Sequence, residues 1–339
     1  MKKTIKAAAA LVAFTAPAFA ANLENPLYVP KAGEVYSKTG VGLMYKKADG
    51  TNAMKAKDHD GATEFPIWRL SESIGYGITD RLSINGEFGY THDGDIDRQG
   101  LNVGRVGLTY RVLQNANELV WDVYADANLG GVSEMKGALV PSKKPSIKPY
   151  SFNYDNYANG RWGFYAGTKI GKTWDKLSAL AFVEINQTFG NDNNKIDLSK
   201  SAFATLAKSA ALELKSTTEY NAGLKAFYEV GSGWSLGGGF TYKHHADNKI
   251  KKVASADVVT PGTEAAVITS LDGNLNALGF KNLNDGFDEY LLSVSVANQL
   301  SDNIQIALYG EYTFDTAHDG SQNGTDVKAE LGVRLNARF

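Results

Sequence analysis

The last fifteen residues, TDVKAELGVRLNARF, alternate strictly between apolar and polar side chains. The apolar positions are Val327, Ala329, Leu331, Val333, Leu335, Ala337 and Phe339. Every position between them is charged or polar except one glycine. Successive side chains of a strand point to opposite faces, so this pattern predicts a β-strand with one fully apolar face and one fully polar face.

The same alternation recurs along the chain and predicts about twelve strands. The repeats include residues 34–46, 74–78, 82–90, 106–112, 121–129, 162–170, 179–189, 220–228, 234–242, 292–296 and 304–314, in addition to the C-terminal segment. Each is near the roughly 9 to 11 residues with which a tilted strand crosses a membrane. An even number of strands also places both ends of the chain on one side.

The connections between these segments alternate in length. Short turns are expected at 79–81, 113–118, 172–177, 230–233 and 301–303, and longer loops at about 47–63, 92–99, 130–160, 190–215, 245–286 and 315–324. Membrane barrels of bacteria have short periplasmic turns and long extracellular loops. The connections therefore favour an all-β, antiparallel, up-and-down transmembrane barrel.

The tryptophans support a membrane-embedded barrel. All of them have the parity of the apolar face, and all lie near an expected strand end. They are Trp68, Trp121, Trp162, Trp174 and Trp234. Aromatic residues gather at the two membrane interfaces of such barrels, so we assign these residues, with Phe339, to the interfaces.

The N-terminus has the features of an export signal. Lys2, Lys3 and Lys6 precede a short apolar run at 7–14, and Ala18-Phe19-Ala20 matches a signal-peptidase site. The apolar run is much shorter than the roughly 20 residues of a membrane-spanning helix. We expect residues 1–20 to be a Sec signal peptide cleaved after Ala20, residues 21–33 a periplasmic lead-in, and residues 34–339 the barrel.

Charge and cysteine content exclude several classes of function. Residues 1–20 hold three of the 35 basic residues and no acidic residue, which leaves 32 basic against 37 acidic and a formal charge of −5. That balance is too mild to indicate nucleic acid as a partner. The chain has no cysteine, so neither disulfides nor zinc–cysteine sites can form. We expect no cofactor and no metal.

On these residues the chain resembles the bacterial outer-membrane β-barrel proteins, in the porin-like class. The resemblance rests on the signal, the alternating loop lengths and the last strand ending in Phe339, and it covers residues 34–339. It implies a Gram-negative outer-membrane location, contact with lipid, and recognition of the terminal strand by the barrel-assembly machinery. A soluble secreted β-sandwich or barrel is the alternative, because it would show the same alternation.

In a barrel the polar face lines the lumen. The expected pore-lining residues are Arg69, Glu87, Arg105, Arg111, Asp122, Asp126, Arg161, Lys169, Glu184, Glu219, Lys225, Glu289, Glu311, Lys328, Glu330 and Arg334. Twelve strands fall between side-chain-filled barrels and open porins. The mixed signs favour a passive or weakly selective pore for small hydrophilic solutes. A non-conducting surface barrel with partner-binding loops is the alternative.

Two loops bear on conduction. Residues 197–215 have a helical spacing of apolar residues behind Asp197 or Ser199, which predicts an amphipathic helix. That helix would either constrict the pore or pack on the extracellular rim. The loop at 245–286 is long for a hairpin connection and would be a lid, a ligand-facing loop or a mobile segment.

The triplet HDG occurs three times, at His59, His92 and His318, and His244 and His245 complete the histidines. Imidazole beside carboxylate suits metal binding or a rim hydrolase. Asp-Gly is also a common turn pair, and the histidines fall at separate loop junctions. We interpret HDG as a strand end entering a turn. No sequence motif of the omptin proteases or of the outer-membrane phospholipases is matched, so we assign no catalytic residue.

Overall fold

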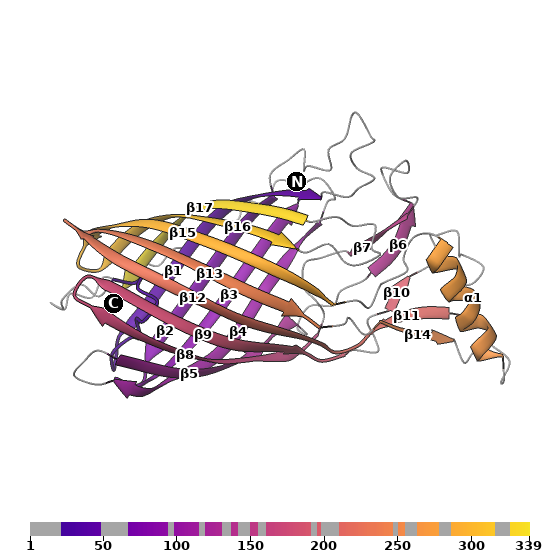
Figure 1. The fold of residues 1–339 in the computed structure, drawn as a ribbon, viewed down its shortest axis with the longest axis horizontal. Coiled ribbons are helices and arrows are strands. Elements are labelled where there is room, and N and C mark those ends of the chain that lie inside the picture. The colour runs from indigo at the N-terminus through magenta and orange to yellow at the C-terminus, as the bar shows by residue number, and fades with distance from the viewer. Residues whose placement is uncertain are drawn as a thin grey trace, which may run out of the picture.

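The computed structural model describes the chain in several ranges (Figure 1). They are residues 22–48, 67–93, 98–114, 119–130, 137–141, 150–154, 161–190, 195–197, 210–246, 250–254, 263–277, 286–315 and 326–339. The expected signal peptide lies outside these ranges. Within them, no helix is long and apolar enough to cross a membrane.

Twelve strands close into one barrel, which confirms the expected architecture. They are β1 (Val35–Ala48), β2 (Ile67–Gly77), β3 (Leu82–Asp93), β4 (Arg98–Gln114), β5 (Leu119–Asn128), β8 (Gly163–Trp174), β9 (Leu177–Thr188), β12 (Thr217–Gly231), β13 (Trp234–His245), β15 (Phe287–Ser301), β16 (Ile304–Asp315) and β17 (Asp326–Arg338). Every neighbouring pair is antiparallel, and β1 closes the barrel against β17, where Leu43 pairs with Leu331. Closure leaves no strand edge of the barrel unpaired.

The outer face of the barrel is apolar, as the alternation predicts. Leu331 is 70% exposed, Val294 65% and Leu224 62%, and all three lie on the same parity as the apolar sets of their strands. Such exposure would be costly in water and is favourable against lipid. Glu72 is an exception in the middle of β2, where its carboxylate accepts hydrogen bonds from Ser37 and Thr39 on the same outer face.

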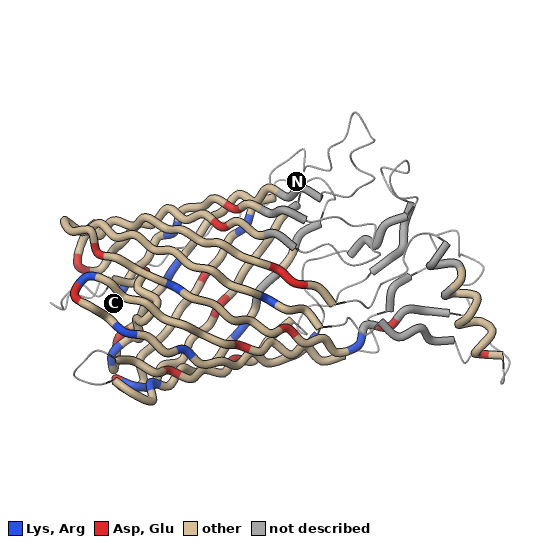
Figure 2. Tube along the Cα trace, viewed as in Figure 1, with Lys and Arg blue, Asp and Glu red and all other residues tan. Residues whose placement is uncertain are grey.

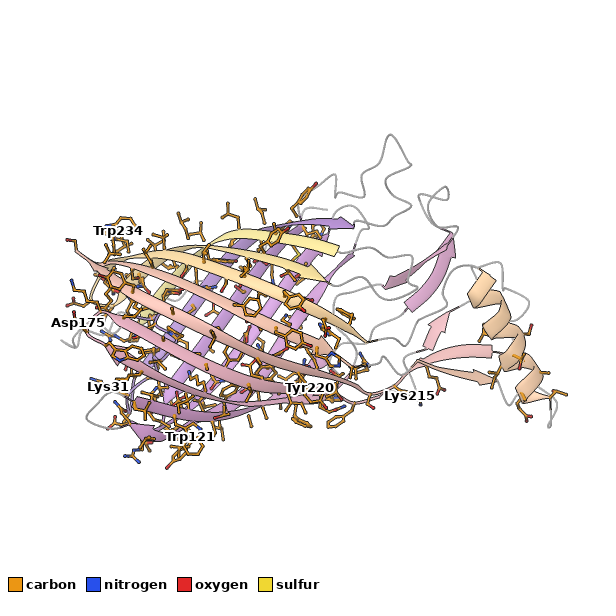
Figure 3. All side chains as sticks on the ribbon, viewed as in Figure 1. Lys31, Trp121, Asp175, Lys215, Tyr220 and Trp234 are labelled. Carbon is orange, nitrogen blue, oxygen red and sulfur yellow. The ribbon has the colours of Figure 1, made fainter. Side chains whose placement is uncertain are left out.

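The two ends of the barrel differ in their connections. The end that carries Asp175 and Trp234 (Figure 3) and the C-terminus, at the left of Figure 1, is called the short-turn end, and the opposite end the long-loop end. Only two residues join β8 to β9, β12 to β13 and β15 to β16. One expected long loop is wrong: β3 and β4 extend through most of 92–99 and leave only residues 94–97 between them. Cross-strand pairing such as His92 with Gln99 accounts for this extension.

The predicted interface aromatics lie on the outside near the strand ends. Trp121 and Trp234 project from the short-turn end on opposite sides of the barrel (Figure 3). All six aromatics are between 39% and 50% exposed: Trp68, Trp121, Trp162, Trp174, Trp234 and Phe339. Their exposed rings at both ends fit an apolar belt bounded by two interfaces.

A second, five-stranded sheet lies beyond the long-loop end (Figure 1). It consists of β6 (Gly137–Pro141), β7 (Tyr150–Tyr154), β10 (Lys195–Asp197), β11 (Ala210–Leu214) and β14 (Ile250–Ala254). The helix expected over 197–215 is wrong at both described ends, because Asp197 belongs to β10 and 210–214 to β11. Pairing of β11 with β14 satisfies the backbone there and outweighs the helical spacing. Residues 198–209 are outside the described ranges.

A helix forms instead in the loop at 245–286, where none was expected. Helix α1 spans Glu264–Ala277 and follows Pro261-Gly262. Thr263 stands at its start, and its carbonyl accepts from the amides of Ala266 and Val267. Leu271 is fully buried. A threonine at the first position and an acidic residue in the first turn are ordinary helix-start signals, which the sequence analysis did not use.

Candidate functional site

The polar face of the strands points into the barrel, and most of the expected pore-lining residues lie on it. Arg69, Glu87, Arg105, Arg111, Asp122, Asp126, Lys169, Glu184, Glu219, Lys225, Glu289, Glu311, Glu330 and Arg334 all have the parity opposite to the exposed apolar residues. Arg161 precedes β8 and donates to the Lys215 carbonyl at 2.6 Å, so it lies at the long-loop end. Lys328 lies in β17, and its side chain is outside the described part of the chain.

Residues 22–34, here called the N-terminal plug, lie inside the short-turn mouth of the barrel. The expected lead-in therefore does not extend away from the barrel. Gln305 of β16 donates to Asn22 at 2.7 Å, and Asn25 donates to Ser178 of β9 at 3.0 Å. The carbonyl of Pro26 accepts from Lys169 of β8 at 3.1 Å. Because these strands lie on different sides of the barrel, the plug crosses the mouth.

An apolar contact fixes the middle of the plug. Leu27 is 6% exposed and packs with Val120 of β5 and with Leu180 and Phe182 of β9. Three large apolar side chains at inward positions are unusual in a polar lumen, and they meet where Leu27 enters. The Leu27 carbonyl also accepts from Arg111 at 2.6 Å. Burial of a leucine side chain stabilises by about 1.5–3 kcal/mol, so this contact is a principal anchor of the plug.

Glu24 is the charged anchor of the plug. Its carboxylate accepts from Arg334 at 3.1 and 3.2 Å and from Asn336 at 2.8 Å. Burial raises the pKa of Glu24, but the charges of Lys38 and Arg334 and the hydrogen bond from Asn336 outweigh burial and hold the pKa below its usual value. The carboxylate is therefore ionised while the plug is seated at neutral pH.

A buried charge cluster supports the plug from the wall of the barrel. Asp122 has no exposed surface and pairs with Arg111 through both carboxylate oxygens, at 2.8 and 3.1 Å. Lys169 lies 3.5 Å from the same carboxylate. Arg111 and Lys169 also donate to plug carbonyls, those of Leu27 and Pro26 respectively. The cluster thus positions the donors that hold the plug.

The lumen toward the long-loop end contains a different set of ion pairs. Arg69 pairs with Glu330 at 3.1 Å, Lys243 pairs with Glu289 at 3.1 Å, and Arg105 pairs with Glu87. Further inward carboxylates accompany these pairs, namely Asp126, Glu184 and Glu219. Tyrosines are interspersed among them: the Tyr309 hydroxyl donates to Glu330 at 2.9 Å, and the Tyr165 ring stacks under Arg105.

The signs of charge are separated along the barrel axis. Carboxylates outnumber cations beyond the plug, toward the long loops, where the carboxylates are Glu87, Asp126, Glu184, Glu219, Glu289 and Glu330 and the cations are Arg69, Arg105, Arg161 and Lys243. Cations outnumber carboxylates around the plug, where the cations are Lys38, Arg111, Lys169, Lys225, Arg334 and Arg338 and the carboxylates are Glu24, Glu34, Asp122 and Glu311. The mixed signs expected from sequence are present, but they are not mixed in space. Charged residues of both signs along the barrel strands are visible in Figure 2.

A cavity of about 250 Å³ lies directly against the plug. Glu24, Asn25 and Pro26 form its floor, and Lys38, Lys225, Glu311 and Arg334 bring charge to its walls. Gly237 and Gly239 of β13 and Ser293 and Ser295 of β15 are inward positions with small side chains, so this sector of the wall leaves open space. The lumen is therefore closed at one mouth without being filled by side chains.

Glu24, Lys38 and Tyr309 are among the residues of this site that sequence analysis missed. Lys38 was recoverable from parity, because Val41, Leu43 and Tyr45 are exposed and Lys38 has the opposite parity on β1. Tyr309 was recoverable in the same way on β16. No periodic signal marks Glu24, since its role depends on the folding of the plug into the mouth.

The described histidines do not converge on one point. His92 is the next-to-last residue of β3 and packs against Trp68 on the outside, with ring centroids 5.5 Å apart. His244 Nδ1 donates to Asp288 at 2.8 Å, and His245 lies 3.3 Å from Glu219 on the neighbouring strand. β3 and β13 are on opposite sides of the closed barrel. No group of three potential metal ligands occurs in the described ranges. His59 and His318 are outside them.

No protein-family profile and no curated protein matches this sequence. Among solved structures, an outer-membrane channel from Pseudomonas putida F1 aligns with a TM-score of 0.55 and 15% identity, covering 93% of this chain and 98% of that one. A mutant of the monoaromatic hydrocarbon channel TodX aligns at 0.42 with 7% identity, covering 93% of each chain. The NanC porin aligns at 0.40 with 9% identity, covering 86% and 98%. The protein has the β-barrel fold of a bacterial outer-membrane channel.

Proposed function

We propose that this protein is a passive, weakly selective pore for small hydrophilic solutes in the Gram-negative outer membrane. The observation that carries the proposal is the charged inward face, which encloses an open cavity inside a barrel whose outer face is apolar. A barrel that served only as a surface scaffold would have no need of a hydrated interior. The cavity volume of about 250 Å³ is below the usual range for drug-sized ligands, which fits small solutes.

Solute passage requires the N-terminal plug to leave the short-turn mouth. The plug is held by a limited number of contacts, chiefly those of Leu27 and Glu24, and it is joined to β1 at only one end of the described segment. A segment tethered in this way can move out without disrupting the strands. We therefore assign the seated plug to the closed state of the pore.

We assign export of the protein to its N-terminal segment and assembly of the barrel to its C-terminal strand. Residues 1–20 would direct export and be removed after Ala20, which would leave the plug at the new N-terminus. The short-turn end would then face the periplasm. Phe339 directly follows β17, and its amide donates to the Val35 carbonyl at 2.8 Å and completes the β1–β17 seam. We assign recognition by the barrel-assembly machinery to this strand.

Cysteine accessibility tests whether solutes pass through the lumen. The native chain has no cysteine, so a single introduced thiol is the only reactive one. Ser293→Cys places it on the cavity wall, and Leu292→Cys places it on the lipid face one residue away, where Leu292 is 47% exposed. Each refolded variant is measured in a planar bilayer before and after a charged, water-soluble methanethiosulfonate reagent.

We expect single-channel currents in both variants and a lasting change of conductance only for Ser293→Cys. An equal response of the two variants would contradict a lumenal path. Absence of current from both the native chain and a variant with a weakened plug would contradict the pore function and favour the non-conducting surface barrel.

A further inference from the structure

The cavity against the plug contains two ammonium groups that are not satisfied by ion pairs. Lys225 of β12 lines the cavity and is exposed to it. Its ammonium lies over the Phe182 ring, 5.2 Å from the ring centroid. Among the described residues, no carboxylate lies within ion-pair distance of Lys225. An inward lysine without a carboxylate partner is a ready site for a soluble anion.

Lys38 approaches from the opposite wall. β1 and β12 are five strands apart in the closed barrel, so the two side chains cross the lumen toward each other. The Lys38 ammonium donates to the Leu23 carbonyl at 2.6 Å and also lines the cavity. The two lysines are near enough to repel one another electrostatically. An anion between them would relieve that repulsion.

The remaining charges leave the cavity with a net positive charge, because Lys38, Lys225 and Arg334 on its lining outnumber the carboxylates Glu24 and Glu311. Arg334 and Glu24 are bonded to each other, so their charges cancel locally. Asp122 is committed to Arg111 and Lys169. Ser293 and Ser295 contribute hydroxyls to the same cavity, and hydroxyls can donate to an anion. The geometry points to one unsatisfied positive region with donors on three sides.

We propose that Lys38 and Lys225 form a binding site for the carboxylate group of a small organic anion, seated on the N-terminal plug. This inference rests on the proposed pore function and names the solute class that the pore would favour. A carboxylate suits two converging ammonium groups, because each of its oxygens can accept from one of them. The acidic residues nearer the long loops would disfavour anions at the entrance, so the site favours retention over rapid passage.

Binding is tested without relying on conduction. Propionate and its neutral isostere propionamide are added to the refolded full-length protein in detergent, and proton line broadening of each probe is measured by NMR. We expect broadening of propionate alone. Equal broadening of the two probes, or none, would overturn the proposal, whereas the pore itself is tested separately by its current.

Variants locate the site. Lys225→Gln should weaken propionate binding about tenfold, since a charged hydrogen bond is lost. Lys176→Gln, at an exposed turn position outside the cavity, is the matched control and should bind as the native chain does. Lys38→Gln should weaken binding to a similar extent. Unchanged affinity in Lys225→Gln, with the barrel folded, would contradict the assignment.

Discussion

The two halves of the lumen differ in the sign of their excess charge and in the groups that their cations bind. Around the plug, cations are in excess and are used to hold backbone carbonyls of residues from another part of the chain, as Arg111 does with Leu27. Toward the long loops, acids are in excess and the cations pair within the wall, as Arg69 does with Glu330. The comparison indicates that cations of the basic half hold a movable segment in place, whereas the ion pairs of the acidic half join residues of the barrel wall to one another.

The largest difference between the halves should be in stability. Asp122→Ala removes a fully buried carboxylate and leaves Arg111 and Lys169 without a counter-charge, which should cost about 3–5 kcal/mol. Asp126→Ala, in the acidic half, removes one hydrogen bond from Asn85 and should cost about 1 kcal/mol. Urea unfolding of the refolded barrels, followed by tryptophan fluorescence, measures both. Equal losses in the free energy of unfolding would contradict the proposed difference between the two halves.

Plug release should follow from neutralising its charged anchor. Glu24→Gln keeps the shape of the side chain but weakens its bonds with Arg334 and Asn336, a loss of about 1.5–3 kcal/mol. The ratio of open to closed time should rise roughly tenfold or more in single-channel recordings. Glu229→Gln, exposed near the same mouth, is the control and should leave gating unchanged. Identical gating in both variants would contradict the role of Glu24 as the charged anchor of the plug.

Acidification should reproduce part of the same release. The pKa of Glu24 is lowered in the seated plug, so its contribution is fully present above the unseated value of 4.5 and is lost as pH falls through the lower seated value. Open probability should stay flat from neutral pH down to about 5 and rise below about 4.5. Glu24→Gln should abolish most of this rise. A rise centred near pH 6 to 7 would point to a histidine instead.

The smallest effect should be rectification of the current. A basic segment and an acidic segment in series attract opposite counter-ions, so ions of one sign accumulate or deplete according to the polarity of the voltage. In the Glu24→Gln background, current at equal and opposite voltages should differ roughly twofold at low salt and should become symmetric at high salt. A symmetric current at low salt would show that the charge separation does not govern ion flow.

The sequence predicted the barrel because the alternation of apolar and polar side chains can be recognised within each strand separately. Val327 to Phe339 divide into two faces without reference to any other segment, and the same holds for Leu82 to Tyr90. Inward and outward positions could therefore be assigned for most of the lumen. The exception, Glu72, lies on the outer face beside hydroxyls of β1, a contact that appears only when β1 and β2 are placed in register.

The plug and the separation of charges could not be predicted in the same way. Parity tells which side of the wall a residue occupies, but its height in the barrel depends on the stagger between strands. Lys38 and Lys225 meet only because five strand pairings set their levels. The position of Glu24 depends on side chains from β1 and β17 together. The helix expected at 197–215 was wrong at its two described ends, where strand pairing of β10 and β11 outweighed the local spacing.

The central claim, that the N-terminal plug closes the pore, is tested most directly by tethering it. Asn25→Cys with Ser178→Cys places two thiols where a hydrogen bond of 3.0 Å now joins the plug to β9, in a chain with no other cysteine. Disulfide formation is checked by gel mobility, and each single-cysteine variant serves as a control. We predict negligible current from the oxidised protein and normal current from the same sample after reduction. Equal currents before and after reduction would contradict the account.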